Sequence, residues 1–163
     1  MKKLYILLLF VLCTPLLKAQ NFTKLIDKYK GKPDVTVLNL DKKMLSSMGK
    51  DVQQYGIEEI QILSLDECDK SLIQAFNKDI EAIKPDGEYE TLVKSVEEDE
   101  FAHILIKAKD HIISEMVILS GEEDEGALVW LKGSLDSNNL GFVNYYLNKW
   151  QPTSLKQNTY PIS

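Results

Sequence analysis

The tetrapeptide Glu-Glu-Asp-Glu occurs twice in the chain, and its carboxylates are the side chains best suited to bind a charged partner. The first copy lies between Val96 and Phe101, and the second lies between Gly121 and Gly126. Clustered carboxylates attract cations, which can be divalent metal ions or the basic side chains of another molecule. The candidate binding residues are Glu97, Glu98, Asp99, Glu100, Glu122, Glu123, Asp124 and Glu125.

Calcium is one ligand that the acidic tetrapeptides could bind. It takes about six to eight oxygen ligands, usually spaced at alternate positions around a turn that contains glycine. Four consecutive acids point in diverging directions, and no D-x-D-x-D-G pattern occurs. We therefore predict no metal and no cofactor. A solvated turn, a docking surface for a cationic partner, a charged margin that prevents pairing of the sheet edge, and a calcium site remain as alternatives.

The two histidines are the remaining candidates for catalysis. The sequence has no G-x-S-x-G, H-E-x-x-H or P-loop motif. If residues 109–110 form a two-residue turn, His103 opposes Met116, and His103 and His111 project to opposite faces of a sheet. A three-residue loop would instead place His103 across from Glu115. We predict a non-enzymatic protein, with a hydrolase or other enzyme that uses His103 and nearby acids as the alternative.

Hydrophobic spacing predicts the elements that carry these residues. Apolar side chains at helical intervals predict four helices, and runs of β-branched and aromatic residues predict six strands. The expected helices cover residues 21–31, 41–52, 69–84 and 136–150. The expected strands cover Val35–Leu40, Ile57–Leu65, Tyr89–Val96, Phe101–Ala108, His111–Leu119 and Ala127–Leu135.

This order predicts an α+β fold, with a mostly antiparallel sheet and helices packed on one face. A mixed sheet is the alternative, because a helix between the first two strands is compatible with a parallel pair. The last four strands have short connections and should form an antiparallel meander. Alternate loops of a meander lie at the same end of the sheet. The two acidic loops should therefore share one edge, with centres on the order of 10 Å apart.

The first nineteen residues have the pattern of a secretory signal peptide. A basic start precedes the apolar run LYILLLFVLC, and Ala19 offers a small residue before a cleavage point. The run is shorter than the roughly 20 residues of a transmembrane helix. Lipid attachment at Cys13 is the rival interpretation, but Leu12 stands where that processing prefers a small residue. We expect an exported protein of the periplasm or the medium, with no transmembrane segment after cleavage.

The mature chain should be strongly acidic. Cleavage after Ala19 removes three of the 19 basic residues and none of the 25 acidic ones, which leaves a net charge of −9. The chain contains no arginine, so nucleic acid is not an expected partner. Only Cys68 remains, and an internal disulfide is impossible. We expect one domain over residues 20–150 and a flexible polar tail over 151–163.

Three segments of the sequence resemble a known family. They are LIDKYKGKPDVTVLNL, IEEIQILSL and ISEMVILSGEEDEGALVWLKGSLDSNNL. Together they resemble the bacterial secreted family called domain of unknown function 4252, over about Phe22 to Trp150. The chain departs from the family pattern at Pro33-Asp34, where a small residue and valine are commoner, and in its longer tail.

The resemblance implies an exported protein of Gram-negative cells with no established activity, cofactor or catalytic residue. No site residue can therefore be transferred from the family to this chain. The turn that carries the second acidic loop is often rich in glycine and acids in the family, which favours a plain turn. Taken together, the sequence predicts a binding or interaction module of the envelope or the medium. Its partner is an unknown protein or ligand, for which a cationic molecule is the candidate. A small periplasmic hydrolase is the alternative.

Overall fold

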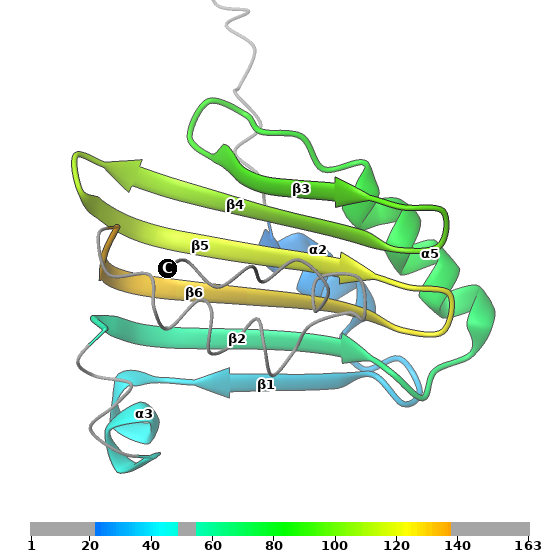
Figure 1. The fold of residues 1–163 in the computed structure, drawn as a ribbon. Helices are drawn as coiled ribbons and strands as arrows, with labels where there is room; N and C mark the ends of the chain where they lie inside the picture. The colour runs from blue at the N-terminus through cyan, green and yellow to red at the C-terminus, as the bar shows by residue number, and fades with distance from the viewer. Residues whose placement is uncertain (1–21, 49–54, 138–163) are drawn as a thin grey trace, which may run out of the picture.

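A computed structural model describes residues 22–48 and 55–137 of the chain (Figure 1). The described part contains the helices α2 (Phe22–Tyr29), α3 (Lys42–Met48) and α5 (Lys70–Glu81). Its strands are β1 (Thr36–Leu40), β2 (Ile57–Leu65), β3 (Glu90–Val96), β4 (Phe101–Lys109), β5 (Ile112–Gly121) and β6 (Gly126–Asp136). The expected signal peptide, the expected helix over 136–150 and the expected tail lie outside the described residues, apart from the first residues of that helix segment.

The six strands form one antiparallel sheet in the order β1-β2-β6-β5-β4-β3. Strand β2 connects the two halves of the chain, because it pairs with β1 on one side and with β6 on the other. The expected meander of β3 to β6 is present (Figure 1). The α+β fold class with a mostly antiparallel sheet is thus confirmed.

The alternative of a parallel pair at the start of the sheet was wrong. Thr36 pairs with Ser64 and Leu40 pairs with Ile60, so β1 and β2 run antiparallel. A parallel pair needs a connection that returns along the full length of the first strand. The chain instead turns back beside the end of β1, where Leu40 pairs with Ile60. Helix α3 lies within this connection between antiparallel neighbours.

Helices α2 and α5 cover one face of the sheet. Each presents apolar residues at spacings of three and four, which lie on one side of a helix. The ring of Tyr29 on α2 meets the ring of Phe76 on α5 edge to face, with centroids 5.1 Å apart. The buried side chains of this layer include Phe22, Ile26, Tyr29, Ile73, Phe76, Ile80, Leu63, Leu65, Leu105, Val117, Leu119, Leu128 and Trp130.

The opposite face of the sheet is also apolar. Helix α3 contributes Leu45 to this second cluster, so two of the three described helices share a face and the third packs on the other. The strand residues of the cluster are Ile57, Ile60, Ile62, Ile104, Ile106, Ile113, Met116, Leu131 and Leu135. Burial on both faces explains why the central strands read as nearly continuous apolar runs. None of the described helices is long and apolar enough to cross a membrane.

The turn between β4 and β5 differs from the expected one. Lys109 pairs with Ile112, so the turn residues are Asp110 and His111, and Asp110 has a φ of 57°. Aspartate tolerates this left-handed conformation better than most side chains. A bulge at Ser114 then shifts the register by one residue.

As a result, His103 pairs with Leu119. The predictions that it would face Met116 or Glu115 were both wrong. The Ser114 hydroxyl donates a hydrogen bond of 3.0 Å to the main-chain oxygen of Lys107, which holds the bulge in place. The bulge also leaves Glu115 on the helix-covered face of the sheet, beside Val117 and next to Trp130.

Candidate functional site

The two acidic tetrapeptides form the same hairpin loop. In the first, the N–H of Glu97 donates to the carbonyl oxygen of Glu100 at 2.8 Å, and in the second Glu122 donates to Glu125 at 2.9 Å. Each loop follows directly on the last pair of its two strands. The repeated sequence therefore repeats a local structure, a four-residue loop closed by its first and last glutamates.

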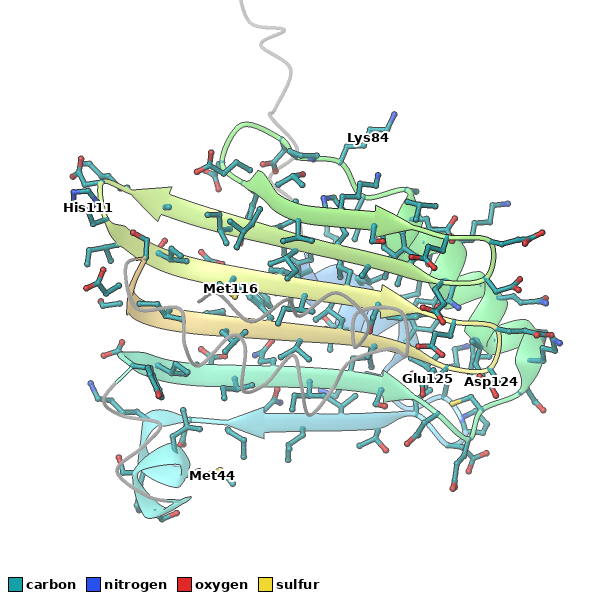
Figure 2. All side chains as sticks on the ribbon, in the orientation of Figure 1. Met44, Lys84, His111, Met116, Asp124 and Glu125 are labelled. Carbon is teal, nitrogen blue, oxygen red and sulfur yellow. The ribbon has the colours of Figure 1, made fainter. Side chains whose placement is uncertain are left out.

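Both loops lie at one end of the sheet beside α5, as the alternation of the meander predicts. Figure 2 shows Asp124 and Glu125 at this end and His111 at the far end. A groove of about 320 Å³ lies between α5 and the two loops. Its lining residues are Gln74, Asn77, Lys78, Glu81, Val96, Glu97, Glu98, Asp99, Glu100, Phe101, Gly121, Glu122 and Glu123.

The groove is strongly acidic. Seven of its thirteen lining residues are acidic and one, Lys78, is basic. Six of the eight predicted binding residues take part, while Asp124 and Glu125 do not line the groove. Helix α5 adds Gln74, Lys78 and Glu81, which share one exposed helical face because they are spaced by four and three residues. We call this site the acidic groove.

Helix α5 also fixes the second loop in position. The side-chain amide of Asn77 donates to the carbonyl oxygens of Glu122 at 2.7 Å and Glu125 at 3.3 Å. Lys70, near the start of α5, forms an ion pair with Glu123. This hydrogen bond raises the pKa of Lys70 and lowers the pKa of Glu123. Asn77 was not among the residues predicted from the sequence, although a polar residue beside the apolar face of a helix is a signal for such a role.

The glycines around the second loop allow this close contact. A Cβ atom on Gly121 would lie 2.6 Å from the Asn77 side-chain oxygen, and one on Gly126 would lie 2.6 Å from the Phe76 ring. Burial raises the pKa of Glu125, and the neighbouring charges of Asp124 and Asp66 add to the effect. The second loop is thus packed through its flanking glycines and its main chain, while Glu123, Asp124 and Glu125 are exposed, as are Glu97, Glu98 and Asp99 of the first loop.

His103 lies in the interior, with 1% of its surface exposed. Its Nε2 atom is 2.9 Å from the hydroxyl oxygen of Thr91, and its Nδ1 atom has no hydrogen-bond partner among the described residues. Burial, and secondarily the charge of Lys94, lowers the pKa of this histidine. The ring is therefore neutral at pH 7 and packs edge to face against Phe101. Its polar neighbours among the described residues are the Thr91 hydroxyl and the Lys94 ammonium.

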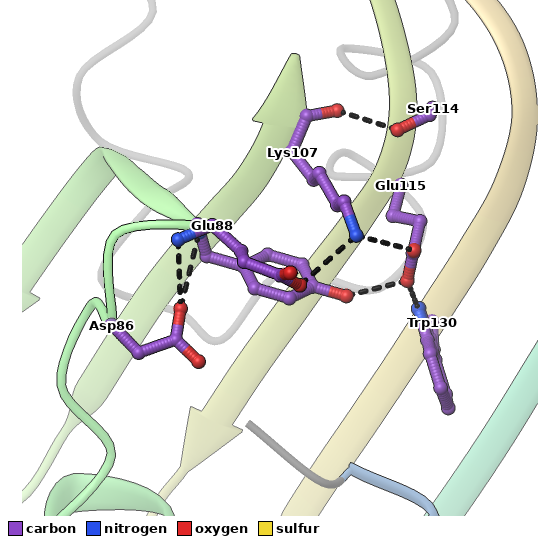
Figure 3. Close-up of polar contacts among 7 residues, drawn as sticks. Asp86, Glu88, Lys107, Ser114, Glu115 and Trp130 are labelled. Carbon is purple, nitrogen blue, oxygen red and sulfur yellow. Dashed lines mark hydrogen bonds and ion pairs between the residues drawn. The ribbon is translucent and has the colours of Figure 1, made fainter. Parts of the chain in front are cut away.

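A second polar cluster lies on the helix-covered face of the sheet (Figure 3). Glu115 accepts hydrogen bonds on one carboxylate oxygen from the Tyr89 hydroxyl at 2.5 Å and the Trp130 indole N–H at 2.9 Å. Its other oxygen lies 3.7 Å from the ammonium of Lys107, which also pairs with Glu88 at 3.0 Å. Burial raises the pKa of Tyr89, and the bond to Glu115 raises it further. Mutual pairing in this cluster indicates a structural role.

Cys68 carries the only free thiol among the described residues. The Cys68 thiol lies 3.7 Å from the carbonyl oxygen of Pro33. Burial raises the pKa of this thiol, and Asp34, Asp66 and Asp69 raise it further, so the nucleophilic thiolate is disfavoured. Within residues 22–48 and 55–137, no three His, Cys, Asp or Glu side chains are arranged to hold a metal ion.

Comparison with known proteins places the chain in a family. No curated protein and no solved structure matches it. The family model described as Domain of unknown function (DUF4252) matches residues 29–142. This match begins at the last residue of α2, includes every described strand and covers more than half of the chain. The chain therefore belongs to the family Domain of unknown function (DUF4252).

Proposed function

We propose that the protein is an exported, non-enzymatic binding module whose acidic groove holds a positively charged segment of a partner. One observation carries this proposal: two loops far apart in the sequence bring their carboxylates to the same groove. Carboxylates that crowd together repel one another, and a cation placed between them relieves that repulsion. Of the described lining residues only Lys78 supplies a positive charge, so the groove keeps a large excess of negative charge.

The lining also suits a basic side chain in shape. Phe101 and Val96 give the groove apolar walls between the acids. Lysine and arginine pack their aliphatic stems on apolar surface while their charged ends reach carboxylates or water. A volume of about 320 Å³ is at the small end of ligand sites, which run from roughly 300 to 1,000 Å³. The groove thus suits one or two basic side chains.

Export is supported by the sequence of residues 1–19, which has the basic start, apolar run and small residue of a signal peptide. A net charge of −9 after cleavage favours long-range attraction of basic partners. The alternative, an enzyme that uses His103, has less support. A general base must reach its substrate, and His103 is buried beside Thr91 and Lys94.

A peptide-binding experiment tests the proposal. The affinity of the purified protein for a fluorescent tetralysine peptide is measured by anisotropy, with tetraglutamate as the negative probe. We expect the triple variant Glu97→Gln, Glu98→Gln, Asp99→Asn to bind tetralysine at least about tenfold more weakly, because screened ion pairs of up to about 1 kcal/mol each are lost.

The matched control carries the same charge change on other surfaces: Asp27→Asn, Glu58→Gln and Asp110→Asn, which do not line the groove. It should bind tetralysine within about twofold of the wild type, because distant exposed charges are screened beyond about 10 Å. Equal weakening by the two triple variants would show that net charge alone attracts the peptide, and the acidic groove would lose its role.

A further inference from the structure

Strand β3 is an edge strand with unusually exposed apolar side chains. Leu92, Val93 and Val96 are 41%, 39% and 67% exposed, and they make up half of the six large apolar residues that are exposed in the described part of the chain. Only β4 pairs with β3 among the described strands. An apolar edge with free main-chain groups is a template for another strand.

The register identifies the main-chain groups that point outward. The N–H of Glu97 bonds to the carbonyl of Glu100, and bonded pairs alternate with non-bonded pairs in an antiparallel ladder. Counting back from the Glu97–Glu100 pair, the pairs Ser95–Ala102 and Val93–Ile104 are therefore the hydrogen-bonded ones. Lys94 and Val96 direct their N–H and C=O groups away from β4. A bulge at Leu92 ends the regular stretch, so a short segment is the natural complement.

The acidic residues at both ends of β3 determine which partner can pair with this edge strand. Glu97, Glu98 and Asp99 follow β3 directly, and Glu90 stands at its beginning, so the apolar stretch has acids at both ends. Val96 and the three acids after it also line the acidic groove, so the edge runs into the groove. A second copy of this chain fits poorly. In an antiparallel pair, the acidic loop of one copy would lie beside Asp86 and Glu88 of the other, and like charges across strands are destabilising.

We propose that the partner is an extended peptide that pairs with β3 as a further strand, with apolar residues along the edge and a lysine or arginine in the acidic groove. This inference rests on the proposed function and adds the binding mode. Main-chain hydrogen bonds to Lys94 and Val96 supply affinity that does not depend on charge. Leu92 and Val93 supply apolar contacts, and the groove selects for a basic residue.

The test uses the fluorescent peptide Lys-Val-Thr-Val-Lys-Lys and two twins, each N-methylated at alternate positions. A strand bonds along one side only, so one twin should bind at least about tenfold more weakly and the other should bind as the parent does. In two-dimensional amide spectra, the signals of Lys94 and Val96 should shift on binding. Leu92→Thr should weaken binding about threefold or more, while Leu38→Thr should not.

Leu38 is the matched control because it is 43% exposed on β1, the edge strand at the other side of the sheet. If both N-methylated twins bind as well as the parent while the Glu97, Glu98 and Asp99 triple variant still binds weakly, strand pairing is overturned and the proposed function stands. If none of the peptides binds at low salt, both proposals fail. A dimer in light scattering that Leu92→Thr dissociates would assign the edge to a second copy and overturn the inference.

Discussion

The side-chain amide of Asn77 donates a 2.7 Å hydrogen bond to the main-chain oxygen of Glu122, and through this contact α5 holds the second acidic loop. The same amide lies 3.3 Å from the carbonyl oxygen of Glu125. Both loops have one closing bond of their own, and these two contacts also fasten the second loop to α5. Helix α5 thus fixes the position of the main chain on the side of the acidic groove that the second loop forms.

Replacing Asn77 tests this attachment. We expect Asn77→Ala to lower the free energy of unfolding by about 1–2 kcal/mol, because two carbonyl oxygens lose their donor. Urea unfolding measures the change. Gln74→Ala is the matched control, since Gln74 is an exposed residue on the same helix, and it should stay within about 0.5 kcal/mol of the wild type. An equally small effect of Asn77→Ala would contradict the role of the amide.

A second prediction concerns Gly121 and Gly126, the glycines beside the second loop. Gly126→Ala should destabilise the protein by about 1–3 kcal/mol, because the new methyl group meets the buried Phe76 ring. Gly121→Ala should cost less, because it meets only the end of the Asn77 side chain. In the Asn77→Ala background, the cost of Gly121→Ala should largely disappear and a substantial cost of Gly126→Ala should remain. Unfolding of the single and double variants measures both couplings.

The Glu115 cluster predicts an asymmetry between its members. Glu115→Ala should cost about 2–4 kcal/mol, since it leaves the Tyr89 hydroxyl and the Trp130 N–H without their acceptor in a largely buried site. Lys107→Met should cost less than about 1 kcal/mol, because the Lys107 ion pairs are partly exposed. Chemical unfolding compares the two variants. A larger loss for Lys107→Met would show that the ion pairs dominate.

His103 predicts how stability depends on pH. The pKa of the buried ring is lowered relative to the unfolded chain, so the unfolded state binds the proton first as the pH falls. The contribution of the neutral His103 ring to the free energy of unfolding should be complete above about pH 6.5. Below that pH the free energy of unfolding should decrease, by at most about 1.4 kcal/mol per pH unit for this one group. Urea unfolding of the wild type and His103→Gln between pH 7.5 and 5 measures the difference.

The difference in the free energy of unfolding between His103→Gln and the wild type should shift in favour of the variant as the pH falls. His103→Gln does not titrate, so its stability relative to the wild type should improve as the pH falls. His111→Gln is the control, because His111 lies in the exposed β4–β5 turn, and its profile should follow that of the wild type. Parallel pH profiles for the wild type and His103→Gln would mean that the buried ring does not contribute to the acid sensitivity.

Much of the fold could be predicted because local patterns determined it. The strand Ile57–Leu65 was predicted with the bounds that the structure has, since its apolar run is flanked by clear turn residues. The convergence of the two acidic loops followed from the alternation of a meander alone. The pairing of His103 could not be predicted, because it depends on the backbone conformation of single residues. The left-handed Asp110 and the bulge at Ser114 moved the partner of His103 to Leu119.

Contacts between elements that are distant in the chain could not be predicted from the sequence. Pairing of β2 with β6 places residues 57–65 against residues 126–133, and nothing in either segment specifies the other. The same holds for the bonds from Asn77 to the second loop and for the meeting of Tyr89, Glu115 and Trp130. The six predicted acids that line the groove could be selected from the sequence because they share a charge. Residues that position them, such as Asn77, could not, because their role depends on packing.

Salt and calcium distinguish a groove for basic side chains from a metal site. The described carboxylates of the acidic groove do not form a set arranged to hold a metal ion, so calcium should act only by screening. We expect equal rises of the thermal midpoint in millimolar calcium and in sodium chloride of the same ionic strength, each measured against chelator. The triple variant Glu97→Gln, Glu98→Gln, Asp99→Asn should start with a higher midpoint at low salt and gain less from either salt, because its repulsion is already reduced. A rise specific to calcium that this variant abolishes would instead show a bound ion, since a ligand held only by the folded state stabilises it by mass action.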